Sequence, residues 1–209
     1  MDKIGEYRLK IYELFYHRPI CEYAETDGRK KTENVLILGS GWIGVEAFKA
    51  VFWAGQCLDS ELNITVASQN ASAFQKQVLS GEPSAVLPAL RLYTEEKHYA
   101  NLFFQDIDVA SGIDQAGLAP LDFENRKYNY IIVSLGDGEH NWIAALELLT
   151  RLYETQRNGL EYSGKRILCI FQEASETVDE EDRTSLVTMG EEYGIEVHFF
   201  GKESPSVSA

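Results

Sequence analysis

The sequence predicts an α/β protein with a doubly wound, mostly parallel sheet of about six strands, preceded by an N-terminal helical segment. Two observations predict this class: short apolar runs alternate with stretches of helical periodicity, and a glycine-rich turn follows the first complete run. Crossover connections between such strands are nearly always right-handed and place helices on both faces of the sheet. The expected order of the six strands is 3-2-1-4-5-6.

The first strand is predicted at VLILG (35–39), whose near-continuous apolar character is typical of a parallel strand buried on both faces. Five later runs of the same kind predict the remaining strands at 63–68, 101–109, 128–136, 165–172 and 195–201. Helical periodicity predicts helices at 43–54, 142–154 and 184–193. Thr177 and Glu180 precede the last helix at the spacing of a capping box, and the prolines and glycine between 81 and 88 predict irregular helix in 70–100.

The N-terminal residues 1–33 are predicted to form a helical segment and a linker. Apolar residues recur there at mixed three- and four-residue spacings until Pro19 interrupts the pattern, namely Ile4, Tyr7, Leu9, Ile11, Leu14 and Phe15. The polar stretch ETDGRKKTEN is interpreted as the linker into the first strand. This divides the chain into the segment 1–33, an α/β domain at 34–201 and a flexible tail at 202–209.

Composition excludes several classes of partner. The 33 acidic and 19 basic residues give a formal net charge of −14, which disfavours binding to nucleic acid. No apolar run of the roughly 18 residues that a membrane helix needs is present, and the N-terminus lacks a signal peptide, so we expect a cytoplasmic protein without membrane insertion. The spacing of the three cysteines predicts neither a disulfide framework nor a metal site, and we expect all three to be reduced, namely Cys21, Cys57 and Cys169.

The turn GSGWIG carries the clearest chemical signal. Gly39, Gly41 and Gly44 have the spacing G-x-G-x-x-G between a strand and a helix, with Ser40, Trp42 and Ile43 between them. In that context the first glycine permits the turn, the second lets the backbone approach a pyrophosphate, and the third allows close helix packing. The alternative is a fold that keeps its glycines for packing alone. We expect Gly39–Gly44 to bind the phosphates of NAD(P) or another adenine nucleotide at the helix N-terminus.

The ends of the second and third predicted strands bear on the nucleotide's identity. NAD-binding domains usually place a carboxylate after the second strand, where this chain has Ser68 and Gln69. NADP, or an adenine nucleotide held differently, is therefore as compatible as NAD, unless Ser68 merely ends the strand. Asp106 and Ile107 end the third strand, where they could contact an adenine or a ribose.

The run YNYIIVSLGDGEHNWIAALELLTRL resembles the Rossmann-type nucleotide-binding domain of potassium-transport regulators, the TrkA-N or RCK family. The resemblance covers this run and the glycine turn, and it implies that Leu135, Gly136, Asp137 and Asn141 lie beside the ligand. Asp and Asn are also preferred near helix N-termini whatever the function. The sequence departs from the family in the missing carboxylate, the N-terminal segment and the lack of an identifiable effector module.

These observations predict a nucleotide-binding regulatory or sensor domain. We assign no catalytic residue, because no two side chains have a sequence spacing that indicates a general acid and a general base. The alternatives are the cofactor domain of an NADP-dependent oxidoreductase and, less favoured, an S-adenosylmethionine-dependent methyltransferase. The helix at 43–54 carries a second apolar stripe of Val45, Phe48 and Phe52 beside Trp53. Either the N-terminal segment or a second subunit must cover it, and we expect a homodimer, with further domains or a transporter as other partners.

Overall fold

The computed structural model describes residues 3–57, 59–79, 100–108, 115–136, 138–173 and 178–201. Its helices are α1 (Lys3–His17), the 3-10 helix η1 (Ile20–Tyr23), α2 (Trp42–Ala54), α3 (Ala71–Leu79), α4 (Gln115–Leu118), α5 (Phe123–Arg126), α6 (Gly138–Arg157) and α7 (Glu180–Glu192). Its strands are β1 (Glu25–Asp27), β2 (Lys30–Leu38), β3 (Ser60–Ser68), β4 (Asn101–Asp106), β5 (Tyr130–Val133), β6 (Arg166–Phe171) and β7 (Ile195–Phe200).

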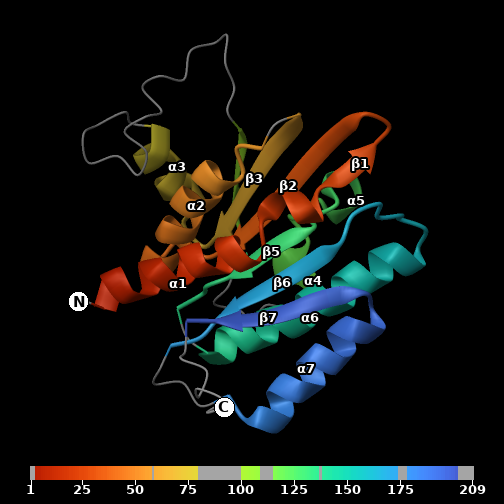
Figure 1. The fold of residues 1–209 in the computed structure, drawn as a ribbon. Coiled ribbons are helices and arrows are strands. Elements are labelled where there is room, and N and C mark those ends of the chain that lie inside the picture. The colour runs from red at the N-terminus through yellow and green to blue at the C-terminus, as the bar shows by residue number, and fades with distance from the viewer. Residues whose placement is uncertain are drawn as a thin grey trace.

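The sheet has the predicted doubly wound topology. Its strands follow the order β4-β3-β2-β5-β6-β7, and each neighbouring pair along this path is parallel (Figure 1). The order reverses between β2 and β5, which are neighbours although β3 and β4 separate them in the chain. The fold is therefore Rossmann-like, and the switch point at which such sheets bind ligands lies between the carboxyl ends of β2 and β5.

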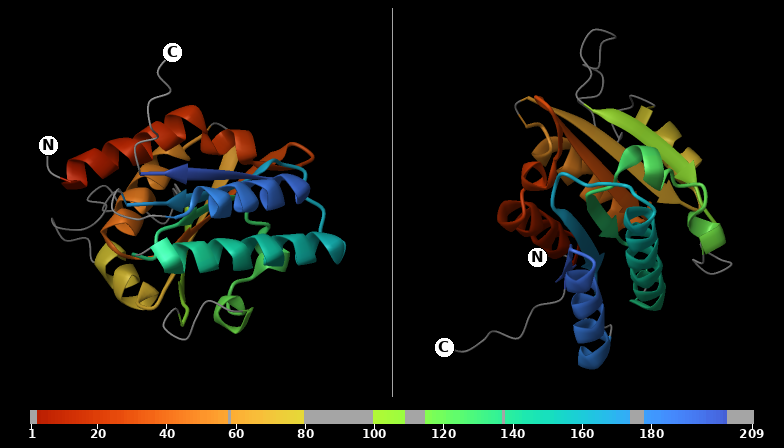
Figure 2. Two further views of the ribbon diagram at one scale, coloured as in Figure 1. Left: turned by 90° about the horizontal axis from the view of Figure 1, so that it is seen from below. Right: turned by 90° about the vertical axis from the view of Figure 1, so that its right-hand side faces the viewer.

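Helices cover both faces of the sheet and enclose one apolar core on each (Figure 2). On the first face α1, α2 and α3 pack over side chains such as Val35, Ile64 and Tyr130. On the second face α4, α5, α6 and α7 pack over side chains such as Leu36, Ile131 and Leu168. Alternate residues of the central strands thus pack into opposite cores, which explains why the buried part of each strand is a nearly continuous apolar run.

Helix α1 completes the first face over the second half of the sheet. Four of its side chains are buried there, namely Tyr7, Ile11, Leu14 and Phe15. Phe15 packs on Tyr130 of β5, with ring centroids 5.7 Å apart. The prediction of an amphipathic helix is confirmed, but Leu9 was placed wrongly on its apolar stripe, because it is 51% exposed.

One further expectation about the N-terminal half is wrong, and the structure decides between two alternatives for another. The polar stretch at 25–34 is no linker: β1 pairs with the start of β2 in an antiparallel hairpin, and Gly28 at the turn has a φ of 62°. Of the two covers considered for the stripe of Phe48 and Phe52, the chain itself supplies one, because both side chains are buried. Phe48 packs on Phe74 of α3 at a centroid distance of 5.4 Å, and α1 lies against α2.

Several boundaries differ from the expected ones. Helix α6 starts at Gly138 and α7 at Glu180, each four residues before the predicted start. The side chain of Asp179 caps α7 by accepting a hydrogen bond from the Glu181 N–H at 3.4 Å. Helix α3 is regular over Ala71–Leu79, whereas the rest of the irregular region, Thr177 of the expected capping box and the tail 202–209 lie outside the described residues.

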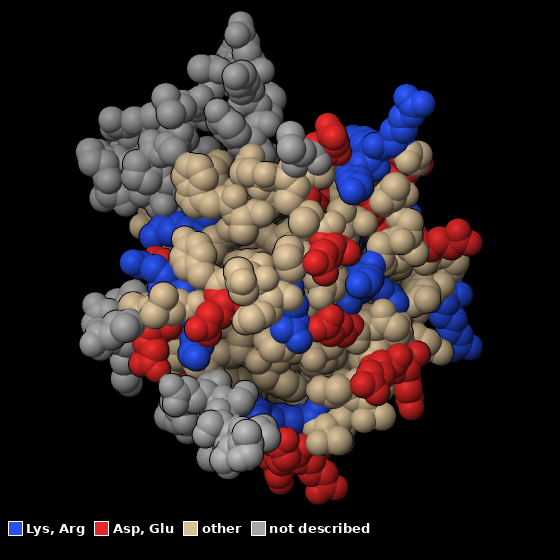
Figure 3. Space-filling view, in the orientation of Figure 1, with Lys and Arg blue, Asp and Glu red and all other residues tan. Residues whose placement is uncertain are grey.

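Acidic and basic side chains are interspersed on the face that carries α1 and α2 (Figure 3). Glu46 of α2 illustrates the mixing, since Arg8 of α1 and Lys49 both contact its carboxylate, at 2.7 and 2.9 Å. None of the helices in the described ranges combines the length and the apolar character that a bilayer-crossing segment requires.

Candidate functional site

The glycine turn lies at the switch point, between the end of β2 and the start of α2. Gly39 has a φ of 111°, and a Cβ added to it would lie 2.1 Å from the carbonyl oxygen of Ser134. A Cβ on Gly44 would lie 2.2 Å from the carbonyl oxygen of Gly39. The fold itself therefore requires a glycine at positions 39 and 44, because backbone atoms of the turn and of the residue after β5 fill the space.

Gly41 differs from the other two glycines of the motif. Its φ of −66° and ψ of −178° are open to any residue, and a Cβ added there would meet no atom of the described part of the chain within 4 Å. It is the N-cap residue of α2, and no side chain caps this helix. Neither packing nor backbone conformation therefore requires a glycine at this position. Because no side chain caps the helix, the first N–H groups of α2 are open to a ligand.

Ser40 and Ser68 join the turn to the next strand. The Ser68 hydroxyl donates to the Ser40 hydroxyl oxygen at 2.8 Å, and the backbone N–H of Asn70 donates to Ser68 Oγ at 3.3 Å. Ser68 is buried, whereas Gln69 is exposed. Ser68 therefore lies beside the glycine turn and is joined to it by a direct hydrogen bond.

Asp106 supplies a carboxylate next to Ser68, since the register of β3 and β4 pairs these two residues. Its Oδ1 accepts from the Ser72 N–H at 3.0 Å, and its Oδ2 accepts a short hydrogen bond from the Ser72 hydroxyl. These bonds, with that from the Ala71 N–H, hold the pKa of Asp106 below its usual range. Asp106 therefore stays anionic and occupies the N-terminus of α3. Ile107 follows as a buried residue whose N–H donates to the Ser68 carbonyl at 3.0 Å.

The end of β5 lies on the other side of the glycine turn from β3, because β2 pairs with β3 along one edge and with β5 along the other. Ser134 is fastened to β2, since its N–H and hydroxyl both donate to the Leu38 carbonyl oxygen, at 2.8 and 3.1 Å. Leu135 is half-buried and Gly136 is exposed. Asp137 lies outside the described residues.

Asn141 sits in the first turns of α6 with both ends of its buried amide engaged. Its Oδ1 accepts from the Leu135 N–H at 2.7 Å, and its Nδ2 donates to the Phe171 carbonyl at 3.0 Å. The side chain thus links the ends of β5 and β6. This structural role explains by itself why an asparagine stands at this position. The contact with a ligand that the family resemblance implies would be a second role of the same side chain.

An aromatic cluster that the sequence analysis missed flanks the glycine turn. Trp42 lies against Tyr7 of α1 and Phe171 of β6, with centroid distances of 5.2 and 6.4 Å, while 40% of its side chain stays exposed. The next residue, Ile43, is buried in the first core. Tyr7 had been assigned to the helical stripe only, and nothing in its spacing pointed to the turn.

The structure brings Gly39–Gly44, Ser68 and Asp106 together through β2, β3 and β4, and Leu135, Gly136 and Asn141 through β5 and α6. Within the described part of the chain, no three His, Cys, Asp or Glu side chains are arranged to hold a metal ion. Ser72 was missed as a member of the site. Its signal was its place three residues after the predicted Gln69, in the first turn of the next helix, where free N–H groups are available.

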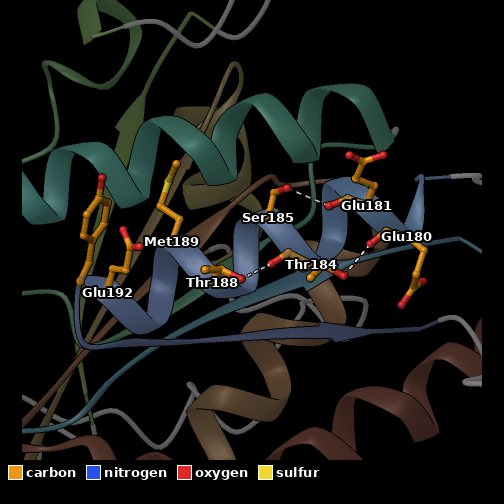
Figure 4. Close-up of a pocket in the computed structure, with 8 residues that line it drawn as sticks. Glu180, Glu181, Thr184, Ser185, Thr188, Met189 and Glu192 are labelled. Carbon is orange, nitrogen blue, oxygen red and sulfur yellow. Dashed lines mark hydrogen bonds between the residues drawn. The ribbon is translucent and has the colours of Figure 1, made fainter.

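A pocket of about 610 Å³ runs along α7, on the face of the sheet opposite α2, and is unrelated to the crevice (Figure 4). The hydroxyls of Thr184, Ser185 and Thr188 donate to carbonyls of the preceding turn, as the dashed lines show. Glu180, Glu181 and Glu192 line the remainder. These carboxylates would repel phosphate groups, so the pocket does not suit a nucleotide.

Comparisons with known proteins identify no family. No family model matches the chain, and no curated protein is significantly similar to it. A solved structure with some likeness is the crystal structure of glucose dehydrogenase from Haloferax mediterranei, with 8% sequence identity and a TM-score of 0.45 over 97% of this chain and 44% of that one. This chain thus spans less than half the length of that enzyme. At such similarity the match carries no argument about ligand or activity.

Proposed function

We propose that the protein binds a phosphate-bearing adenine nucleotide, such as NAD(P), in the crevice formed by the glycine turn. The observation that carries the proposal is Gly41, the one glycine of the motif whose side-chain space is empty and whose backbone would accept any residue. A glycine that the fold does not need is explained by a ligand that must approach the backbone closely. The uncapped N-terminus of the 13-residue helix α2 offers N–H donors and a partial positive charge to the phosphates.

A thermal-shift screen with NAD, NADH, NADP, NADPH, ATP, AMP and S-adenosylmethionine tests the proposal. At a ligand concentration of 100 times Kd, binding to the folded state adds about 2.7 kcal/mol to the free energy of unfolding. For a chain of this size this is a rise in Tm of roughly 5–10 °C. If none of the seven compounds shifts Tm, the crevice is not a nucleotide site.

We further propose that Asp106 makes the site favour an unphosphorylated ribose. The carboxylate stands beside Ser68, where sequence analysis found the usual acidic residue missing, and it fills the α3 N-terminus that a 2′-phosphate would otherwise use. A carboxylate accepts hydrogen bonds from ribose hydroxyls and repels a phosphate.

We expect NAD to bind more tightly than NADP, and Asp106→Asn to shift the ratio of the two Kd values toward NADP by roughly tenfold, because it removes one negative charge beside the ribose. Calorimetric titration of both nucleotides measures this ratio. Asp122→Asn is the matched control, since Asp122 also caps a helix but packs with α5 near the second core. A preference for NADP in the unmodified protein would contradict the assignment.

For the biological role we propose a regulatory domain of the TrkA-N (RCK) type, supported by GSGWIG and GDGEHN in strand-turn-helix contexts. The nucleotide would then act by its different affinity for two states of the protein. Reproducible hydride or methyl transfer by the purified chain would instead favour the oxidoreductase or methyltransferase alternative. Self-association also stays a prediction, and Phe48 and Phe52 do not supply its interface because the chain itself buries them.

A further inference from the structure

An exposed tryptophan stands directly beside the glycine turn. Trp42 is the first residue of α2 and follows the N-cap residue Gly41. Its indole packs on the rings of Tyr7 and Phe171, at centroid distances of 5.2 and 6.4 Å, yet 40% of the side chain is exposed. Single exposed apolar side chains are common on protein surfaces, so the position of Trp42 decides whether its exposure has a use.

Trp42 lies on the side of the turn that carries β5 and β6. Its neighbour Phe171 is the last residue of β6, and the Phe171 carbonyl oxygen accepts from Asn141 Nδ2 at 3.0 Å. Asn141 Oδ1 in turn accepts from the N–H of Leu135, two residues after the end of β5, at 2.7 Å. The indole therefore borders the carboxyl ends of these two strands, where open parallel sheets bind their ligands.

The other side of the turn holds the polar groups that suit an adenosine. Ser68 and Asp106 end β3 and β4, and the strand order puts β3 and β4 on one side of β2, with β5 and β6 on the other. A dinucleotide lies across such a switch point with its pyrophosphate at the glycine turn. With the adenosine ribose at Asp106, the second half of a dinucleotide extends toward Trp42, which a mononucleotide would not reach.

We propose that the exposed part of Trp42 is the stacking surface for the second ring of a dinucleotide, and that it makes the site select dinucleotides over mononucleotides. This inference rests on the proposed nucleotide binding. An indole offers a wide planar surface on which a heteroaromatic ring stacks favourably. Neither Tyr7 nor Phe171 stacks parallel on the indole, since the interplanar angles are 49° and 80°.

Helix α1 takes part in this site through Tyr7, which is a positioning residue. The Tyr7 ring is buried between Trp42 and Phe171, at a centroid distance of 5.2 Å from each. The next residue, Arg8, contacts Glu46 of α2 at 2.7 Å and holds the two helices together at the same level. The N-terminal helix thus fixes the orientation of the indole beside the phosphate-binding turn.

The test is calorimetric titration with NAD and with ADP-ribose, which lacks only the nicotinamide ring. We expect the unmodified protein to bind NAD about tenfold more tightly than ADP-ribose, because one stacked ring contributes an effect of this size. Trp42→Leu should lose this preference by weakening NAD alone, with the Kd of ADP-ribose changed by less than about twofold. Retained binding of ADP-ribose also shows that the variant is folded. Trp42→Phe keeps an aromatic ring and should retain most of the preference.

Trp53→Leu is the matched control, because Trp53 is also exposed on α2 but lies at its other end, and both affinities should stay unchanged. Equal affinity of the unmodified protein for the two compounds would overturn the role of Trp42 and leave the nucleotide site standing. A loss of both affinities in folded Trp42→Leu, or of neither, would do the same. If the unmodified protein binds neither compound, the proposed nucleotide site fails, and the role of Trp42 fails with it.

Discussion

Gly41→Val is expected to abolish nucleotide binding and to leave the fold intact. Among the described residues no atom lies within 4 Å of a Cβ at this position, so a valine side chain fits there, and we expect it to occupy the position of the pyrophosphate. The backbone conformation at this position suits valine, so the free energy of unfolding should fall by no more than about 1 kcal/mol, the usual range for a changed N-cap. Urea unfolding and the thermal shift with the best ligand of the screen measure the two quantities.

Gly44→Ala is the matched control and should have the opposite effect. Its new methyl group would lie 2.2 Å from the Gly39 carbonyl oxygen, so α2 would have to move away from β2. We expect a loss of at least about 3 kcal/mol in the free energy of unfolding, at the upper end of what overpacking costs. If Gly41→Val destabilised the protein as strongly as Gly44→Ala, Gly41 would serve the fold, and the main support for a nucleotide would fall.

Asn141→Ala is expected to be strongly destabilising. The substitution leaves the Leu135 N–H and the Phe171 carbonyl without the partner that Asn141 now provides. An unsatisfied buried polar group costs about 1–3 kcal/mol, so the free energy of unfolding should fall by about 2–4 kcal/mol and Tm by roughly 10 °C. Asn158→Ala, at an exposed position just after α6, should change stability by less than about 0.5 kcal/mol.

The same variant separates the two roles considered for Asn141. If it acts only by linking β5 to β6, the destabilised variant should keep most of its nucleotide affinity, as calorimetric titration below its Tm would show. Lost affinity with unchanged stability would instead favour the ligand contact implied by the family resemblance.

The topology followed from the sequence because the buried part of each central strand is a nearly continuous apolar run, which is typical of a parallel sheet covered on both faces. The hairpin of β1 and β2 was missed because its residues are polar and extend beyond the apolar part of β2. Asp27 and Gly28 form a dipeptide typical of tight hairpins and could have revealed it. The sequence left open whether the N-terminal segment or a second subunit covers Phe52, because helical spacing alone does not tell that α1 lies against α2.

At the candidate site, the sequence located the glycine turn but not the hydrogen bonds around it. The pairing of Ser68 with Ser40 and of Asp106 with Ser72 depends on the register of neighbouring strands and on where α3 begins. Neither is encoded by local spacing. The link from Asn141 to Phe171 likewise joins residues that are 30 positions apart in the chain.

The contacts of α1 have a consequence for protein synthesis. Arg18, just after α1, binds Glu196 of β7 at 2.6 Å across a separation of 178 residues, and Tyr23 donates to the same carboxylate at 2.8 Å. At about 5–20 residues per second, a ribosome makes Glu196 roughly 10–35 s after Arg18. During that interval the apolar side of α1 has no completed sheet to cover. The apolar side of α1 therefore stays without its packing partners on β7 until that strand has been made.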